Sequence, residues 1–561
     1  MRSSLDKALL YARTISYLKP SQLYYRLWFK IKKNYTRIDY SMEICSRSRC
    51  FKWKAPISRK NSLTDVDEFY FFYQKARVSN VGWNGEDQSV LWRYNQHYFD
   101  DLNSENCVDR KPWHRSLILS WITNNKIGEG VGWDPYPTSL RIVNWIKWSL
   151  SGNQLTHELM LSLHLQMQWL MQRIEYHLLA NHLFTNGKAL VFAGLFFEGS
   201  TADLCFEKGL QIVETELDEQ ILGDGGHFER SPMYHSIILE DILDLLNLLG
   251  EYDLGSTKVD RLRCRLSEVV EPMFGWLNHM VHKDGEISFF NDAAIAIAPN
   301  LSQLVGYAQS LGFDIDNNRK ERIKVLKDSG YISLRNDIAL LILDCGLVGP
   351  DYQPAHVHAD TLSFELSVGS KRVIVNSGTS LYEAGEKRTK QRGTAAHNTV
   401  SIDGKNSSEV WGAFRVGRRA RPFNLEINER EQFIQVNCSH DGYWHLTDKP
   451  THNRQWIFEE DKLIVKDEVN RLVGKGHAEA MFFIHPDAKV VSQNQDGTRG
   501  ILEFADQMGI TWFVQKGKLR IEETSWYPEF GLDIPNYCLV VTLENGCSEV
   551  HFLWEKVSMS D

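Results

Sequence analysis

The sequence predicts two domains, a helical layered or toroidal domain followed by an antiparallel β-sandwich. Its 561 residues are about twice the length at which single hydrophobic cores stop growing. From about residue 60 to 325, apolar side chains recur at three- and four-residue intervals, as in amphipathic helices. After Gly330 the chain consists of short β-branched runs bounded by Gly, Asp, Asn or Lys. This change of period places the domain boundary near residues 317–328.

The first 60 residues form a basic N-terminal arm. They hold 15 Lys and Arg against three acidic residues, a net charge of +12. Since the whole chain has a net charge of −9, the remaining residues carry −21. Residues 19–33 mix basic and bulky apolar side chains, which is typical of segments that lie on anionic membrane surfaces. A basic helix packed on an acidic body explains the same composition, and both interpretations stay open.

Helical periodicity defines the domain at residues 61–325. Long amphipathic stretches succeed one another, separated by loops that contain Gly, Asp or Pro. We expect helices at residues 139–150, 155–180, 188–197, 202–220, 236–249 and 263–282.

Strand periodicity defines the domain at residues 330–561. Many short strands at close spacing favour an antiparallel sandwich. We expect strands at residues 332–335, 339–343, 363–368, 372–376, 399–402, 433–437, 456–459, 462–467 and 539–542.

Targeting signals and the cysteine pattern bear on location. The longest early apolar run, residues 8–12, is shorter than the apolar region of a signal peptide, and no transmembrane helix is evident. The nine cysteines are scattered without a C-x-x-C pair, which is typical of free thiols in a reducing compartment. We expect a cytoplasmic protein or one peripheral to the inner membrane, with a periplasmic location still open. The acidic net charge argues against binding of nucleic acid.

Two groups of reactive side chains lie in the helical half. Asn181 and His182 stand at the end of the predicted helix 155–180. A glycine loop, residues 223–226, leads into a helix whose first turns carry Glu229, Arg230, Tyr234 and His235. A tyrosine beside a cation can act as a general acid or base, although a cap, a surface histidine and a structural tyrosine fit these residues too.

Two further groups lie in the strand half. In the extended segment HVHADTLSFE, residues 356–365, the side chains of His356, His358 and Asp360 project to one face. Three polar side chains on one face rarely serve packing, so metal ligation or catalysis is favoured. In the loop before AAHNTV, residues 395–400, Arg392 precedes His397, and nitrogen ligands of this kind suit a zinc-like ion.

Together these blocks resemble the heparinase II/III family of polysaccharide lyases. The resemblance runs over about residues 80–480, and HVHADTLSFE and AAHNTV are its most specific parts. The family's fold is an (α/α) toroid, an incomplete barrel, followed by an antiparallel β-sandwich. It agrees with the order of helices and strands read from periodicity.

The resemblance implies β-elimination at a uronic acid of an acidic polysaccharide. Such an enzyme removes the C5 proton, expels O4 and leaves a 4,5-unsaturated sugar, so it must also neutralise the carboxylate. By this resemblance Asn181, with His182, binds the carboxylate. Tyr234 is the acid, or both base and acid, and His356 is the base or a partner that tunes Tyr234.

Substrate contacts and a metal site follow from the same resemblance. We expect contacts from Glu229, Arg230, His235, Arg392 and Trp411, with Trp133, Tyr136 and Trp145 as further cleft aromatics. No cofactor is required for the chemistry. In family members that hold a metal, the ligands correspond to His358, residue 376 and His397 of this chain. Residue 376 is Asn here instead of the usual Asp, so it brings no charge to the site. A structural divalent metal, zinc or calcium, would brace the loop beneath His356, and its presence stays open.

Other functions stay open from the sequence. A glycoside hydrolase on the same scaffold needs two carboxylates about 5–10 Å apart, for which Glu229, Asp284, Glu286 and Asp292 are candidates. A uronate C5-epimerase shares the proton abstraction, and a non-catalytic polysaccharide-assembly protein could keep the fold. The basic N-terminus resembles that of heparinase-like proteins of bacterial exopolysaccharide or surface-polysaccharide production. The sequence does not predict the uronic-acid polymer, endo or exo cleavage, syn or anti elimination, or the oligomeric state.

Overall fold

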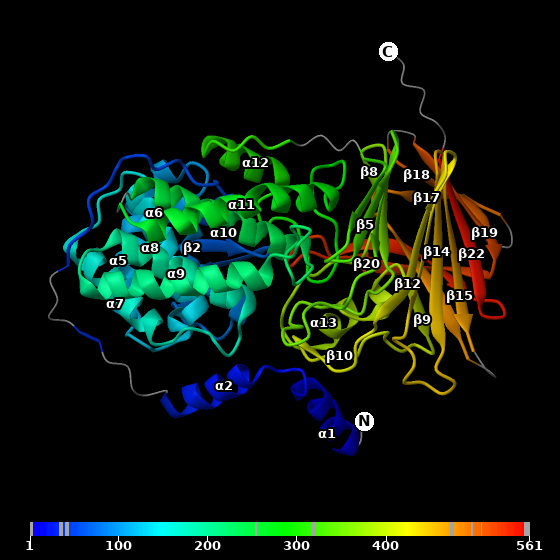
Figure 1. The fold of residues 1–561 in the computed structure, drawn as a ribbon, viewed down its shortest axis with the longest axis horizontal. Coiled ribbons are helices and arrows are strands. Elements are labelled where there is room, and N and C mark those ends of the chain that lie inside the picture. The colour runs from blue at the N-terminus through cyan, green and yellow to red at the C-terminus, as the bar shows by residue number, and fades with distance from the viewer. Residues whose placement is uncertain are drawn as a thin grey trace, which may run out of the picture.

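A helical domain and a two-sheet domain lie side by side, and the two N-terminal helices run beneath both (Figure 1). The structure is a computed structural model that describes residues 4–32, 38–39, 44–252, 255–316, 321–471, 476–494, 498–505 and 508–554. Among its helices, none has both the length and the apolar character needed to span a bilayer.

The helical domain is preceded by the arm helices and a small three-stranded sheet. The arm contains α1 (Ser4–Ile15) and α2 (Pro20–Lys32), and the small sheet contains β1 (Leu63–Asp65), β2 (Glu68–Phe71) and β3 (Gln74–Arg77). The helices of the domain are α3 (Val78–Val81), α4 (Val90–Tyr98), α5 (Lys111–Asn124), α6 (Pro135–Leu150), α7 (His157–Met171), α8 (Ala180–Phe196), α9 (Ser200–Gln220), α10 (Pro232–Glu251), α11 (Thr257–His279) and α12 (Leu301–Ser310).

The predicted helix at residues 155–180 is wrong in one respect, because a loop at residues 172–179 divides it into α7 and α8. The side-chain oxygen of Asn186 accepts a hydrogen bond from the Glu175 backbone N–H at 2.8 Å. Leu179 has φ 64°, a left-handed conformation that an α-helix does not contain. Asn181 therefore lies in the first turn of α8 and not at the end of a longer helix.

The sandwich consists of an inner sheet and an outer sheet. The inner sheet has the order β20-β21-β16-β8-β7-β6-β5-β4, with β9 paired to β16, and the outer sheet has the order β12-β13-β14-β15-β22-β19-β18-β17. The inner strands are β4 (Ile323–Leu326), β5 (Tyr331–Arg335), β6 (Ala339–Asp344), β7 (Phe364–Val368), β8 (Lys371–Ile374), β9 (Val400–Ile402), β16 (Ala478–Ile484), β20 (Lys518–Trp526) and β21 (Ile534–Thr542). The outer strands are β12 (Pro422–Glu429), β13 (Phe433–His440), β14 (Thr451–Glu459), β15 (Lys462–Asn470), β17 (Lys489–Gln493), β18 (Arg499–Glu503), β19 (Gly509–Lys516) and β22 (Cys547–Trp554).

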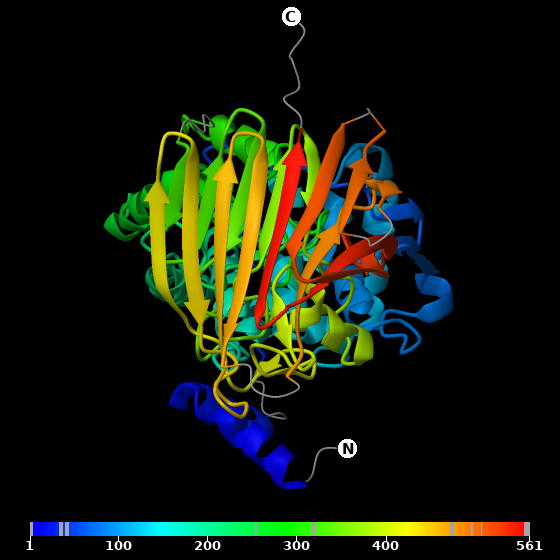
Figure 2. The same ribbon diagram turned by 90° about the vertical axis from the view of Figure 1, so that its right-hand side faces the viewer.

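The inner sheet packs on both faces. In β6, Leu340 and Ile342 join the core of the helical domain, whereas Leu341 and Leu343 join the core between the sheets. This alternation is the two-residue period of a strand. Figure 2 shows the outer sheet in front of the helical domain, with the inner sheet between them. Loops of the inner sheet consequently meet the helical domain.

The domain junction falls between α12 and β4. The last helix ends at Ser310 and the first sandwich strand begins at Ile323. The predicted boundary at residues 317–328 overlaps this interval, and residues 317–320 of it lie outside the described residues.

Candidate active site

Two tyrosines and a histidine meet where the domains join. Tyr234 lies in the first turn of α10, where its backbone N–H donates to the Ser231 hydroxyl at 3.2 Å. Its ring centroid is 3.9 Å from that of His356, and its hydroxyl is 2.9 Å from the hydroxyl of Tyr382. His356 and Tyr382 both belong to loops of the sandwich domain. The cluster therefore requires both domains.

Asp292 orients His356. Its Oδ2 lies 3.0 Å from Nδ1 of His356, and the Arg388 guanidinium pairs with both of its oxygens. Burial alone would raise the pKa of Asp292, but Arg388 and the neighbouring histidines hold it well below its usual range. The anionic carboxylate favours a proton on Nδ1, which leaves the lone pair on Nε2 of His356. His356 is thus prepared to accept a proton through Nε2.

Glu229 faces the same nitrogen. Its Oε2 lies 3.6 Å from Nε2 of His356. Both carboxylate oxygens are buried and have no hydrogen-bond partner among the described residues. Burial raises the pKa of Glu229. His356, the Asn181 backbone N–H and His182 oppose this shift, so Glu229 lies between Asn181 and His356.

Asn181 and His182 lie next to each other in the first turn of α8. The Oδ1 of Asn181 is buried without a partner among the described residues. Nδ1 of His182 lies 3.2 Å from Glu175, and its ring packs 4.5 Å from the Tyr136 ring. Burial opposes the charged imidazole, but Glu175 outweighs it and raises the pKa of His182. A helix N-terminus, an amide and an imidazolium together suit a carboxylate ligand.

Strained backbone borders the cluster. Arg230, next to Glu229, has φ 59°, and Asn291, next to Asp292, has φ 58°. A non-glycine residue in this region costs about 1–3 kcal/mol and is typical of functional sites.

Arg230 and His235 point away from the cluster. The Arg230 guanidinium donates to the backbone carbonyl of Leu347 and so links the two domains. Both ring nitrogens of His235 are engaged, one with the His227 backbone N–H at 3.2 Å and one with the Met273 carbonyl at 3.0 Å. His235 therefore has no free nitrogen for the predicted substrate contact, whereas Nε of Arg230 is buried without a partner among the described residues, so its contact stays a prediction.

Arg392 and Trp411 hold loops in place. Arg392 donates to the carbonyls of Val357 and Ala413, both at 3.0 Å, and burial lowers its pKa to about 9. Trp411 donates from Nε1 to the Thr14 hydroxyl of the arm at 3.1 Å. Arg392 therefore supports the loop of His356, with its Nη2 buried and unpartnered among the described residues, while Trp411 binds the arm.

Of the predicted cleft aromatics, Tyr136 lies beside the cluster through its contact with His182. Trp133 and Trp145 are buried in the helical core.

Tyr382 and Arg388 were not predicted from the sequence. Both lie after β8 in a polar stretch, residues 380–390, that matches no motif. The one available signal is a tyrosine in a loop between two predicted strands, since loops often carry functional side chains.

Two of the three predicted metal ligands, His358 and His397, meet, but Asn376 does not complete the site. Nδ1 of His358 lies 3.2 Å from Nε2 of His397, while the other ring nitrogen of His358 contacts Asp292 at 2.8 Å. The amide of Asn376 is engaged with the Phe289 carbonyl at 2.9 Å and the Asn398 backbone N–H at 3.1 Å. Among the described residues, no three His, Cys, Asp or Glu side chains cluster as metal ligands. The residues present do not fit a three-ligand metal site.

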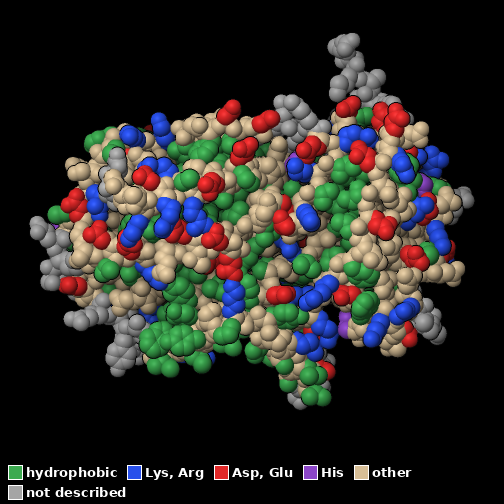
Figure 3. Space-filling view, viewed as in Figure 1, with side chains coloured by type: hydrophobic (Ala, Val, Ile, Leu, Met, Phe, Trp, Pro, Cys, Tyr) green, Lys and Arg blue, Asp and Glu red, His purple; other side chains and the backbone are tan. Residues whose placement is uncertain are grey.

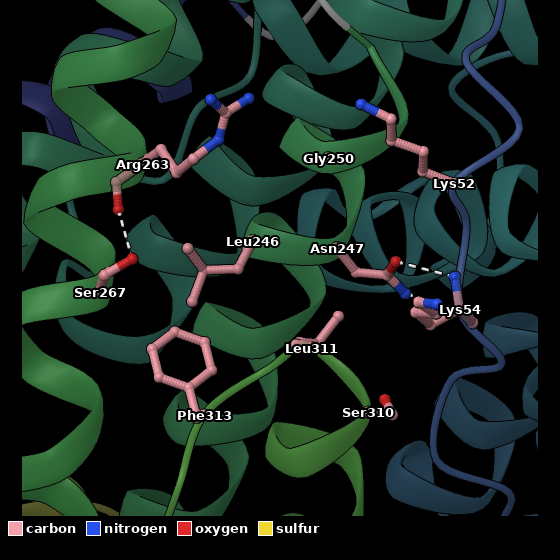
Figure 4. Close-up of a pocket in the computed structure, with 10 residues that line it drawn as sticks. All are labelled: Lys52, Lys54, Leu246, Asn247, Gly250, Arg263, Ser267, Ser310, Leu311 and Phe313. Carbon is pink, nitrogen blue, oxygen red and sulfur yellow. Dashed lines mark hydrogen bonds between the residues drawn. The ribbon is translucent and has the colours of Figure 1, made fainter.

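A separate pocket lies between α10, α11 and α12 (Figure 4). It has a volume of about 290 Å³ and is lined by Lys52, Lys54, Asn247, Arg263 and Phe313, among others. Its lining shares no residue with the Tyr234 cluster, so it is not the candidate active site.

Family models match most of the chain. Residues 128–310 match the model described as Heparinase II/III N-terminus, and residues 318–549 match Heparinase II/III-like, C-terminal. The chain belongs to the heparinase II/III family. The recognition made from the sequence is thereby confirmed.

Individual relatives of this heparinase II/III protein are distant. A protein named heparin-sulfate lyase from Bacteroides stercoris is 24% identical over 379 residues, 63% of this chain and 53% of its own length. FtsZ-localized protein C from Caulobacter vibrioides is 23% identical over 352 residues, 59% of this chain and 57% of its own length. The chain spans little more than half the length of these curated relatives.

Solved structures of the family share the fold. The crystal structure of Heparinase III has a TM-score of 0.65 and 17% identity, covering 84% of this chain and 78% of its own. A heparan sulfate lyase mutant from Pedobacter heparinus has a TM-score of 0.58 and 15% identity, covering 87% and 81%. The predicted toroid followed by a β-sandwich is confirmed.

Proposed function

We propose that this protein cleaves a uronic-acid-containing polysaccharide by β-elimination. The observation that carries the proposal is the contact between the Tyr234 phenol and the oriented His356 imidazole, with Asn181 linked to His356 through Glu229. Family membership and relatives named heparin-sulfate lyase support the same reaction class.

The carboxylate of the sugar binds at the start of α8. The Asn181 amide and the protonated His182 ring donate to it, which lowers the cost of placing a second negative charge beside it. Glu175 favours the charged form of His182. Asn181 and His182 therefore make the C5 proton acidic enough to be removed.

Proton transfer follows in balanced steps. Nε2 of His356 takes the C5 proton, and the electrons of that bond form the C4=C5 double bond. The C4–O4 bond breaks, and the Tyr234 hydroxyl gives its proton to the departing O4. Burial, followed by the nearby Tyr382, raises the pKa of Tyr234 well above its ordinary value, so the phenol is protonated at neutral pH and suits the role of acid.

The proximity of the two rings favours one stereochemistry. Since the His356 and Tyr234 centroids are 3.9 Å apart, both groups would approach the sugar from one side. In D-glucuronate the C5 hydrogen and O4 lie on the same side, whereas in L-iduronate they lie on opposite sides. We therefore infer syn elimination at D-glucuronate-type residues.

The alternatives fit the cluster less well. Hydrolysis needs two available carboxylates across the sugar. Glu229 is one candidate, but Asp292 is paired with Arg388 and Asp284 with Arg372 at 2.7 Å. Glu286 lies beside Asn300 and Arg372, outside the cluster. Epimerisation needs a proton donor on the opposite face of C5, whereas the two rings share one side. A non-catalytic assembly protein needs no oriented proton acceptor beside a phenol.

A panel of uronic-acid polymers tests the proposal. We expect near-ultraviolet absorbance from unsaturated ends, with polymers of D-glucuronate cleaved about tenfold faster or more than L-iduronate-rich ones. Cleavage that leaves saturated ends would refute elimination, and a preference for L-iduronate would refute the syn geometry alone.

A further inference from the structure

The N-terminal arm is anchored to the body by its inward face. Arg13 of α1 forms a two-bonded ion pair with Glu409, with both distances 2.8 Å. Tyr11 packs edge-on against Trp411, at 4.9 Å between ring centroids. These contacts attach α1 to the sandwich domain.

The second arm helix is attached to the helical domain. Tyr25 packs 4.8 Å from Tyr176, and Phe29 packs 5.2 Å from His177. Gln22 is buried and donates to the Tyr352 carbonyl at 3.2 Å. The two attachments fix which face of each helix points outward.

The outward faces are apolar. In α2, exposed apolar side chains follow the spacing i, i+1, i+4, i+5 and i+8, which lies on one side of a helix. Ile31 is 77% exposed and Leu27 is 63% exposed. The other exposed apolar side chains, apart from Tyr11 against Trp411, complete a set of Leu5, Leu9, Ile15, Leu23, Tyr24, Leu27, Trp28 and Ile31. Figure 3 shows hydrophobic side chains gathered along the lower edge of the molecule, where Figure 1 places α1 and α2.

Basic side chains border this apolar surface. Arg26 and Lys30 are exposed beside the apolar stripe of α2, and Lys7 is exposed on α1. The first 60 residues carry +12 on a protein whose remainder carries −21. Apolar side chains bordered by Lys and Arg, with Trp and Tyr among them, match the boundary between the headgroups and acyl chains of an anionic bilayer.

We propose that α1 and α2 dock the protein on anionic phospholipid surfaces, with their outward apolar faces inserted and their basic side chains at the headgroups. Both helices lie along one edge of the molecule in two perpendicular views (Figures 1 and 2), so they can meet one surface together. This inference is independent of the proposed lyase activity, because it rests on the arm alone.

Vesicle co-sedimentation with the full chain tests the inference. We expect binding to phosphatidylcholine vesicles that contain about one third phosphatidylglycerol, and about tenfold weaker binding or less to pure phosphatidylcholine. About 0.5 M NaCl should weaken the binding, because salt screens the basic side chains. No binding to the anionic vesicles would overturn the inference.

Paired variants locate the binding surface. The double variant Leu27→Glu/Ile31→Glu should lose vesicle affinity about tenfold or more while keeping the circular dichroism of the native protein. The matched control is Val108→Glu/Leu204→Glu, at two apolar side chains that are each 65% exposed away from the arm. Equal loss in the control would overturn the inference. The inference would also be overturned if the protein did not bind anionic vesicles and instead formed a dimer that Leu27→Glu/Ile31→Glu dissociates.

Discussion

The phenol oxygens of Tyr234 and Tyr382 lie 2.9 Å apart, one from helix α10 and the other from a loop of the sandwich domain. In a buried cluster such a pair can pass a proton along, so Tyr382 can help restore the proton that Tyr234 gives to O4. The contact also makes the site dependent on the way the two domains pack.

Replacing Tyr234 should separate catalysis from stability. In Tyr234→Phe, we expect kcat to fall about 10²–10⁴-fold because the general acid is lost. The free energy of unfolding should change by only about 1 kcal/mol, the worth of one hydrogen bond. Tyr331→Phe is the matched control, since that buried hydroxyl donates to the Arg230 carbonyl at 2.7 Å outside the cluster. Activity in Tyr234→Phe equal to that of the control would contradict the assigned role.

Replacing Asp292 should destabilise the protein as well as inactivate it. Asp292→Asn leaves the buried Arg388 guanidinium without its anion, which costs about 3–5 kcal/mol. Asp533→Asn is the control, because its pair with Lys387 is exposed and should be worth under about 1 kcal/mol. Urea denaturation compares the two. Similar losses of unfolding free energy in the two variants would contradict the buried ion pair between Asp292 and Arg388.

Stability should fall as the pH falls below about 6.5. Burial lowers the pKa of His97 and of His235 to about 3, so the folded protein keeps both rings neutral where the unfolded chain protonates them. The contribution of these rings to the free energy of unfolding is therefore complete above pH ~6.5. Below that pH, each ring lowers the free energy of unfolding by about 1.4 kcal/mol per pH unit until the pH reaches its folded pKa. Urea midpoints measured from neutral to acidic pH check the slope. His235→Gln should make it shallower, and an unchanged slope would contradict the account.

Restoring a carboxylate at residue 376 should create a metal site. Asn376 stands near the contact between His358 and His397, through its bond to the Asn398 backbone. Asn376→Asp supplies a charged third ligand, so we expect higher zinc content by elemental analysis and a zinc-dependent rise in the unfolding midpoint. Asn398→Asp serves as the control. Equal zinc in the wild type and Asn376→Asp would contradict this prediction.

The fold was largely predictable because burial imposes simple periods. The three- and four-residue spacing in α9 and α10 and the short β-branched runs such as β6 identify the two domains. The division between α7 and α8 was not predictable in this way. It depends on the left-handed backbone of Leu179 and on the Asn186 side chain, and neither alters the apolar spacing of the sequence.

Site residues were predictable only where they lie within a recognisable sequence motif. Tyr234 and His356 lie in recognisable blocks, and the structure brings them together. Arg230 and His235 share a block with Tyr234, but a helix and a turn direct them elsewhere. The partnership of Arg388 with Asp292 joins residues 96 positions apart. No local pattern records such a contact.

Elimination with Tyr234 as the acid is tested most directly by the mass of the new non-reducing ends formed from a D-glucuronate polymer. Elimination adds no water and leaves an unsaturated sugar, whereas hydrolysis adds one water. We expect unsaturated ends from the wild-type protein and from Tyr331→Phe, and almost none from Tyr234→Phe. Ends that carry added water, or unsaturated ends formed equally by Tyr234→Phe, would contradict it.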